Sequence, residues 1–247
     1  MIVSLSSGSV RFGCNKNNVI EFIKENFADL IDGIELCFIL KEELECFELS
    51  KNDLNFINSL QFNTLHAPVN LGYGKNKETK TILEKIHTIN KKVELKQVVF
   101  HPDRVSDFSV LAESGLKVCI ENLPDGEKRK GWQFPKEFQK FFNKWPQFGF
   151  CFDVNHAMAN GINPSEFIST LGEKMNYIHL NATAKAGNAD HDLLIEASEE
   201  TLEKIKPVFK LQKPLVIEVD IEKQKIPLIK NEVHLIRKLA NQEGKPL

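Results

Sequence analysis

Short apolar runs recur along the whole chain, and seven of them carry a residue with metal-binding or proton-transfer chemistry at or next to their last position. The runs are DGIEL with Glu35, FNTLH with His66, QVVFH with His101, KVCIE with Glu121, FGFCFD with Asp153, NYIHL with His179 and PLVIE with Glu218. A strand of a parallel sheet that is buried on both faces reads as a near-continuous run of large apolar residues. The pattern therefore predicts a series of buried parallel strands.

Amphipathic stretches with helical spacing lie between these runs. In KTILEKIHTINKKV, Ile82, Ile86 and Ile89 recur on one helical face, and IPLIKNEVHLIRKLANQ repeats the pattern as the last helix. Helices are also expected over residues 18–30, after the loop SSGS, and over SDFSVLAESG, with Gly115 as its C-cap. The strands are expected to begin near Ile2, Gly33, Phe62, Gln97, Lys117, Gly149, Asn176 and Pro214.

Successive predicted strands begin roughly twenty to forty residues apart, which suits a unit of one strand, one helix and two short loops. Eight such units predict an α/β fold, a (β/α)₈ barrel that forms one domain over residues 1–247. In such a barrel the C-terminal ends of all strands point into one mouth. The polar residues at the ends of the runs would then meet in a single pocket.

Composition and charge narrow the function without identifying it. A chain of 247 residues with a formal net charge of −2 and a pI near 6.4 has no global attraction to nucleic acid or to an anionic membrane. The N-terminus lacks a basic stretch followed by an apolar core, and no segment approaches the roughly 18 apolar residues that span a bilayer. We therefore expect a cytoplasmic protein without membrane contact, and the sequence indicates no protein partner.

The cysteines indicate a reducing compartment. They are Cys14, Cys37, Cys46, Cys119 and Cys151, and no pair has the CxxC spacing. Three of the five lie inside or beside apolar runs. This placement favours buried thiols over a disulfide framework or a structural zinc site.

Imidazoles and carboxylates predominate among the polar strand ends. Five of the seven histidines fall at or just after a predicted strand end, whereas His87 and His234 fall on predicted helices. One such histidine alone is more often a hydrogen-bonded core or rim residue, but the whole set favours a metal centre. Mixed nitrogen and oxygen ligands suit Zn²⁺ or Mn²⁺, and the candidates exceed the roughly four to six ligands of one ion, so we predict two or three ions. The predicted ligands are His66, His101, Glu121, Asp153, His156, His179, Asp190, His191 and Glu218.

Some of these residues point to a separate part of the centre. Asp153 and His156 form a D-x-x-H pair just past a predicted strand, and His191 follows Asp190 in a later loop. His156, His191 and Asp190 could complete a second site beside the first. Asp190 has another interpretation, because a loop aspartate more often forms a turn or caps a helix.

Six motifs occur in order along the chain: LHAPVNLG, VVFHPD, CIENLP, CFDVNHAMANGINP, YIHLN and VIEVD. They resemble those of the xylose isomerase-like superfamily of TIM barrels (AP endonuclease family 2), which includes endonuclease IV and sugar isomerases and epimerases. The segment CFDVNHAMANG is the most specific element of the resemblance. The resemblance covers essentially the whole chain and implies a barrel with a divalent-metal centre.

In endonuclease IV three zinc ions share a set of ligands, and the resemblance carries almost the whole set to this chain. By that resemblance His66 and His101 would bind one ion, Glu121 would bridge it to a second ion held by Asp153, His179 and Glu218, and His156 and His191 would hold the third. The family's loop carries an Asp-x-His pair. Here Ala189 occupies the aspartate position and Asp190 lies one place later, which puts the third ion in question.

Two enzyme classes fit these residues. In a hydrolase, clustered ions activate a water and neutralise the leaving oxygen of a phosphodiester, and damaged DNA would be the substrate. In an isomerase or epimerase, one ion holds a sugar or sugar phosphate, while Glu121 and Glu218 move a proton. We prefer the hydrolase because of the many histidines, although Glu35 is more typical of the sugar enzymes and is equally well explained as a rim carboxylate paired with a Lys or Arg. A metal-free binding module is disfavoured because nearly all candidate ligands are present.

Two loops carry candidate substrate contacts. The first is NLGYGKNKETK with Tyr73, and the second is DGEKRKGWQF with Lys128, Arg129 and Trp132. Basic groups beside an aromatic ring can neutralise phosphates and stack on an exposed base or sugar. Tyr73 would be the counterpart of the family's intercalating tyrosine. A solvated basic loop is the commoner explanation for such a segment.

Overall fold

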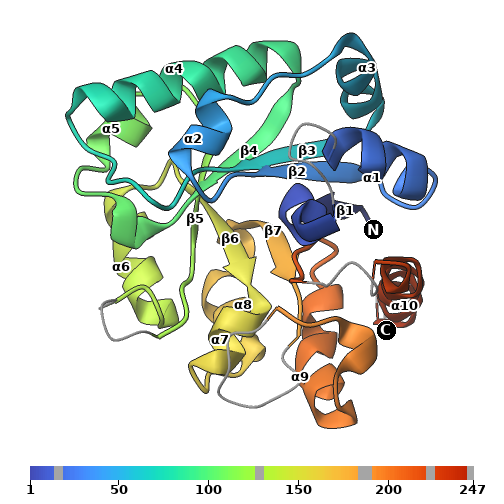
Figure 1. Cartoon of the computed structure of the whole chain (residues 1–247). Helices are drawn as coiled ribbons and strands as arrows, with labels where there is room; N and C mark the ends of the chain where they lie inside the picture. The colour runs from blue at the N-terminus through green and yellow to red at the C-terminus, as the bar shows by residue number, and fades with distance from the viewer. Residues whose placement is uncertain (14–18, 126–130, 183–190, 221–225, 244–247) are drawn as a thin grey trace.

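In the computed structural model, eight parallel strands close into a barrel in the order β1 to β8. Figure 1 shows the strands at the centre of the molecule with helices around them. The structure describes residues 1–13, 19–125, 131–182, 191–220 and 226–243. The strands are β1 (Val3–Ser6), β2 (Gly33–Cys37), β3 (Phe62–His66), β4 (Leu95–Phe100), β5 (Val118–Glu121), β6 (Gly149–Asp153), β7 (Met175–Leu180) and β8 (Leu215–Ile217). The predicted (β/α)₈ barrel is therefore confirmed.

Helices surround the barrel. The α-helices are α1 (Val19–Phe27), α2 (Lys41–Glu45), α3 (Lys51–Ser59), α4 (Lys77–Lys92), α5 (Ser109–Ala112), α6 (Pro135–Lys144), α7 (Val154–Ala159), α8 (Pro164–Leu171), α9 (Glu199–Phe209) and α10 (Leu228–Glu243). The 3₁₀ helices within the described ranges are η1 (Ser7–Gly13), η3 (Pro102–Arg104), η4 (Gly172–Lys174) and η5 (Leu194–Glu196). No helix in the described ranges has both the length and the apolar character needed to cross a bilayer.

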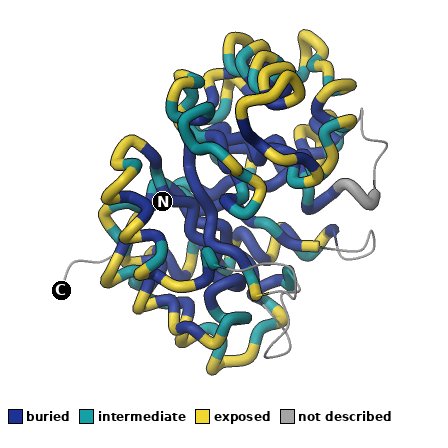
Figure 2. The backbone as a smooth tube through the Cα atoms, turned by 90° about the vertical axis from the view of Figure 1, so that its left-hand side faces the viewer, coloured by how far each residue is buried: buried dark blue, intermediate teal, exposed yellow. Residues whose placement is uncertain are grey.

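The core lies between the barrel and its helices. Every second strand residue faces outward, and side chains such as Leu5, Ile34, Leu65 and Ile178 are fully buried there. Figure 2 shows this distribution, with the barrel strands dark blue and the outer helical surfaces yellow. The near-continuous apolar runs are explained, because strands covered on both sides need apolar residues in both directions.

Part of the barrel interior just below its mouth is apolar and lies beside the buried carboxylate of Glu35. A small cluster of Val99, Cys119, Cys151, Tyr177 and Val216 fills this level. Because strand side chains alternate, the residue two positions later, at the end of the strand or just past it, faces inward one level closer to the mouth. Those residues are His101, Glu121, Asp153, His179 and Glu218. The alternation of side chains along the strands thus places these polar residues together at the mouth, above the small apolar cluster.

Three predicted segments differ from the structure. Most of the loop expected at SSGS instead forms the start of η1 (Ser7–Gly13), and the helix expected over residues 18–30 ends at Phe27. The stretch SDFSVLAESG forms only the single turn α5, because side chains compete for its backbone groups: the amide of Ser109 donates to Asp107 Oδ1 and the Ser114 hydroxyl donates to the carbonyl of Leu111. The C-cap of α5 is Glu113, so the prediction of Gly115 was wrong, although Gly115 has a φ of 74°.

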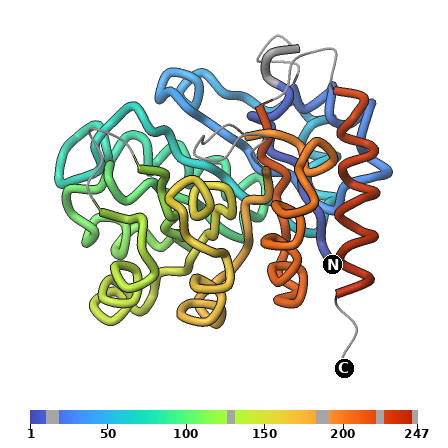
Figure 3. The backbone as a smooth tube through the Cα atoms, turned by 90° about the horizontal axis from the view of Figure 1, so that it is seen from below, coloured from blue at the N-terminus to red at the C-terminus, as the bar shows by residue number. Residues whose placement is uncertain are grey.

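The last helix closes the barrel beside its first strands. In Figure 3, α10 lies next to the N-terminal segment. The Arg237 guanidinium donates to Asp32 Oδ2 at 3.0 Å and to the carbonyl of Leu30, and Asp32 Oδ2 also accepts the amide of Val3 at 2.9 Å. This network ties α10 to β1 and to the start of β2 at the N-terminal end of the barrel.

Candidate metal centre

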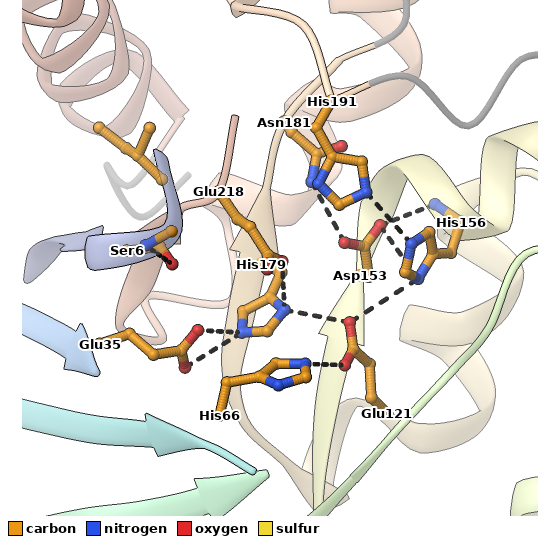
Figure 4. Close-up of polar contacts among 12 residues, drawn as sticks. Ser6, Glu35, His66, Glu121, Asp153, His156, His179, Asn181, His191 and Glu218 are labelled. Atoms are coloured by element: carbon orange, nitrogen blue, oxygen red, sulfur yellow. Dashed lines mark hydrogen bonds and ion pairs between the residues drawn. The ribbon is translucent and has the colours of Figure 1, made fainter. Parts of the chain in front are cut away.

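The polar strand ends meet at one mouth of the barrel, as the sequence predicted. Eight residues supply atoms that form three groups, and within each group the atoms lie within 4.8 Å of one another. Figure 4 shows most of these side chains pointing toward a common centre. The groups are His66, His101 and Glu121 (the first group), Glu121, Asp153, His179 and Glu218 (the middle group), and Asp153, His156 and His191 (the third group).

The first group has the spacing of a tetrahedral site. The Nε2 atoms of His66 and His101 are 3.2 Å apart, and Glu121 Oε2 lies 3.4 Å from the first and 3.2 Å from the second. Ligand atoms about 2.0–2.1 Å from a tetrahedral zinc ion lie about 3.3–3.4 Å from one another. The three atoms thus match one face of such a tetrahedron.

The middle group is built around His179. Its Nδ1 lies 3.1 Å from Glu121 Oε1 and 2.8 Å from Glu218 Oε2. Glu121 therefore turns one oxygen toward the first group and the other toward the middle group. A carboxylate in this position can bridge two ions.

The third group shares Asp153 with the middle group. The Nε2 atoms of His156 and His191 lie 3.3 Å apart. Asp153 Oδ1 accepts the amide of His156 at 2.7 Å, so Asp153 caps α7 and His156 stands on the first turn of that helix. The D-x-x-H spacing follows from this cap, because a cap residue and the third residue of the helix lie on the same side.

Outer hydrogen bonds orient three of the imidazoles. His66 Nδ1 lies 3.0 Å from the Ala67 carbonyl and His156 Nδ1 lies 2.8 Å from the Asn122 carbonyl, so both nitrogens must donate. His179 is turned the other way, with Nε2 directed at the carboxylate of Glu35. Each ring therefore presents its second nitrogen to the centre, which is how metal-binding histidines are commonly held.

Buried asparagines hold Asp153. Asn122 and Asp153 exchange two hydrogen bonds of 2.8 Å between the side-chain amide of the first and the backbone of the second. Asn181 Nδ2 donates to Asp153 Oδ2 at 3.1 Å. Sequence reasoning assigned these asparagines no role, although each follows a predicted ligand by one or two positions: Glu121 for Asn122 and His179 for Asn181.

His191 is placed by its own backbone. Ala182 and Asp192 form a two-way bridge, with N–O distances of 2.9 and 2.8 Å, and the amide of Asp220 donates to the His191 carbonyl at 2.7 Å. These bonds fix His191 beside the end of β8. Asp190 and Ala189 lie outside the described residues, as do Lys128 and Arg129.

The centre combines burial with strong electrostatic coupling. Burial raises the pKa of Glu121, but His179 and the neighbouring imidazoles of His101 and His66 outweigh this effect and hold that pKa well below its usual range. Burial lowers the pKa of His179, but Cys151 and the nearby carboxylates outweigh this effect. The pKa of His179 is therefore raised well above its usual range. For His101 burial prevails, and its pKa is lowered. Without a bound ion, the carboxylates around His179 thus favour the charged form of its ring, and the ring favours the charged form of Glu121.

The chemistry of the donor set fits divalent cations. Among the described residues, the ion pairs of Glu35, Glu121, Asp153 and Glu218 all go to imidazoles. Glu121 Oε2 is buried and accepts no hydrogen bond, although two imidazole nitrogens face it. Uncompensated buried carboxylates are costly, and a bound cation would supply the missing charge.

Three predicted substrate contacts lie elsewhere than expected. Tyr73 is 1% exposed, and its hydroxyl donates to the Pro68 carbonyl at 2.7 Å. Trp132 is half-buried and packs against Phe138 and Phe141, with ring centroids 5.5 and 5.3 Å away. Glu35 is fully buried behind His179. The burial of Tyr73 does not fit an intercalating role.

Comparisons with known proteins agree with the resemblance predicted from the motifs. Residues 90–196 match the family model described as xylose isomerase-like TIM barrel, a segment that contains six of the eight clustered residues. No curated protein matches the chain. Many solved structures share the fold.

Three of these structures illustrate the range of that fold. Endonuclease IV from Thermus thermophilus has a TM-score of 0.70 at 14% identity and covers 98% of this chain and 100% of its own. A protein described as the probable 3-DHS dehydratase of Bacillus anthracis has a TM-score of 0.71 at 16% identity, covering 96% and 99%. D-Psicose 3-epimerase from Clostridium cellulolyticum has a TM-score of 0.65 at 11% identity, covering all of both chains. At these identities the likeness shows the fold alone.

Proposed function

We propose that this chain is a metal-dependent phosphodiesterase of the endonuclease IV kind, which hydrolyses the DNA backbone at abasic sites with two or three zinc or manganese ions. One observation carries the proposal: the three groups of ligand atoms adjoin one another. Glu121 belongs to the first and middle groups, and Asp153 belongs to the middle and third groups. A reaction that needs a single ion has no use for three groups joined in this way. Phosphoryl chemistry does, because clustered ions can act on both the attacking and the leaving oxygen.

Each group would hold one ion with residues of this chain. His66 and His101 would hold the first with one oxygen of Glu121, and Glu218 and His179 would hold the second with its other oxygen. Bound divalent ions would lower the pKa of a coordinated water and neutralise charge on the phosphate. The third group supplies three ligands in its described part, so we infer the weakest binding there.

The open side of the centre indicates where a substrate would enter. The side chains of Glu218 and His101 are 16% and 12% exposed, whereas those of Glu121, Asp153 and His179 are at most 1% exposed. A phosphodiester would therefore approach across Glu218 and His101. The buried Glu121 would hold its position throughout, since imidazoles surround both of its oxygens.

A sugar isomerase or epimerase is the second candidate, and one observation favours it. The middle group alone offers four ligand atoms from Glu121, Asp153, His179 and Glu218, enough for a single ion with two carboxylates as an acid–base pair. The first and third groups weigh against it, because their four additional histidines have no role in that reaction. Glu35 no longer supports it, since its carboxylate is fully buried behind His179.

Cleavage of a duplex with one abasic site, assayed beside a panel of ketoses and sugar phosphates, distinguishes the two candidates. We expect strand cleavage that depends on zinc or manganese and no isomerisation. The variant His101→Ala should lose cleavage, whereas His234→Gln, which changes an exposed histidine of α10, should keep it. Isomerisation without cleavage would establish the sugar enzyme instead.

A further inference from the structure

Glu35 stands at the centre of a small buried network on the inner wall of the barrel. It belongs to β2, and its side chain is fully buried. Its Oε2 accepts from the Thr64 hydroxyl at 2.9 Å and from the Tyr177 hydroxyl at 3.1 Å. His179 Nε2 lies 3.2 Å from the same oxygen and 3.1 Å from Oε1. These side chains come from β2, β3 and β7 and meet only inside the closed barrel.

A carboxylate in this place needs a physical reason. Removing a carboxylate from water costs several kcal/mol unless a partner charge and hydrogen bonds compensate. The two hydroxyls compensate in part, and the described ion pairs of Glu35 go to His179 alone. An uncharged glutamine or an apolar residue would pack at this position with less cost, so the carboxylate charge itself is the feature to explain.

The carboxylate of Glu35 determines which nitrogen of His179 faces the middle group. Because Nε2 is held by Glu35, His179 must present Nδ1 to the middle group, where it lies 2.8 Å from Glu218 Oε2 and 3.1 Å from Glu121 Oε1. A histidine that donates one nitrogen to a carboxylate is a more basic and better oriented ligand through the other. The outer partners of His66 and His156 are neutral carbonyls.

We propose that Glu35 is a positioning residue that fixes His179 with Nδ1 toward the middle group and makes this group the tightest metal site of the chain. Thr64 and Tyr177 hold the carboxylate in place through Oε2. The inference rests on the proposed function, in that it requires the centre to bind divalent ions. It adds a hierarchy: the middle ion binds first, and the ions of the first and third groups exchange more readily.

The charge of Glu35 can be removed with almost no change in shape. In Glu35→Gln the hydroxyls of Thr64 and Tyr177 can rotate to accept from the new amide, so the network survives without its charge. Competition with a chromogenic zinc chelator measures the affinity for the first ion. We expect Glu35→Gln to weaken it by about 10- to 100-fold, the usual effect of losing such an outer partner.

Matched variants separate charge from packing. Thr64→Val and Tyr177→Phe each remove one hydrogen bond to the carboxylate and leave its charge, so each should change the first affinity only a few-fold. Equal affinity in wild type and Glu35→Gln, or equal losses in all three variants, would overturn the positioning role. Absence of zinc binding by the wild type would instead overturn the proposed function, so the two failures are distinguishable.

A measurement on the unaltered protein covers the case in which Glu35→Gln does not fold. Long-range ¹H–¹⁵N spectra of the zinc-loaded wild type report which nitrogen of each histidine carries a proton. We expect His179 to be protonated at Nε2 and metal-bound through Nδ1, opposite to His66. Metal on Nε2 of His179 would contradict the proposal.

Discussion

Glu232 is a buried carboxylate far along the chain from most of the metal ligands, and its environment makes stability depend on pH. It lies on α10 with no exposed surface, and its oxygens accept the amides of Leu194 and Ile195 at 2.7 and 3.0 Å. Burial raises its pKa to about 7, against the lowering effect of the two amides. These bonds also anchor η5, the segment that follows His191.

The sign of the effect follows from proton linkage. Between the unfolded pKa of about 4.3 and the folded pKa of about 7, the folded protein holds a proton that the unfolded chain releases. The stabilisation from the protonated Glu232 is therefore complete below pH about 4.3 and is lost as the pH rises through 7. At about 1.4 kcal/mol for each pH unit, the loss is roughly 3 to 4 kcal/mol.

The variant Glu232→Gln removes this ionisation. It also loses one acceptor for the two amides, at a cost of about 1–3 kcal/mol that does not depend on pH. Urea denaturation of both proteins at several pH values from 5 to 8, at fixed metal content, gives the difference in free energy of unfolding. Contributions from the metal centre cancel in that difference.

We expect the variant to gain about 3 kcal/mol relative to the wild type between pH 5 and 8. It should therefore be the less stable protein at pH 5 and at least as stable at pH 8. A difference that stays constant with pH, or that changes in the opposite direction, would refute the reasoning about Glu232.

Three further predictions concern the centre and the barrel. Glu121→Gln should abolish activity, because this one side chain belongs to two of the groups, and it should leave the far-UV circular dichroism unchanged. An active variant would contradict the bridging role of Glu121. Chelation should remove activity reversibly, with recovery on adding zinc or manganese, and activity in excess chelator would count against a metal-dependent reaction. Gly33→Ala should lower the free energy of unfolding by about 1–3 kcal/mol or more. The Cβ of the new alanine would lie 1.9 Å from the Phe62 carbonyl oxygen and 2.3 Å from Ser4 Oγ. An unchanged urea denaturation curve would contradict that clash.

The strand ends were predictable because they depend on two local rules. Apolar runs identify buried parallel strands, and the alternation of side chains places residues such as Glu121 and His179 inside the mouth. The barrel topology then brings them together whatever their separation in sequence. The eight clustered residues were accordingly among the nine that the sequence predicted as ligands.

The partners of those residues were not predictable, because they depend on packing between distant segments. Tyr73 looked like a substrate contact in a polar loop, but its ring packs edge-on against Phe100 at 4.9 Å, and nothing local encodes that contact. Glu35 looked like a rim carboxylate or substrate ligand, yet it faces His179, which is 144 residues away in sequence. The shortness of α5 was missed for a local reason, since the serines around it bind their own backbone.

Metal content tests the central claim most directly. The account holds that the three groups around Glu121 and Asp153 are adjoining ion sites. Elemental analysis of the purified chain, supplied with zinc and manganese and separated from unbound ions, should find two or three of these ions for each polypeptide. One ion, or none, would contradict a clustered metal centre and the phosphodiesterase built on it.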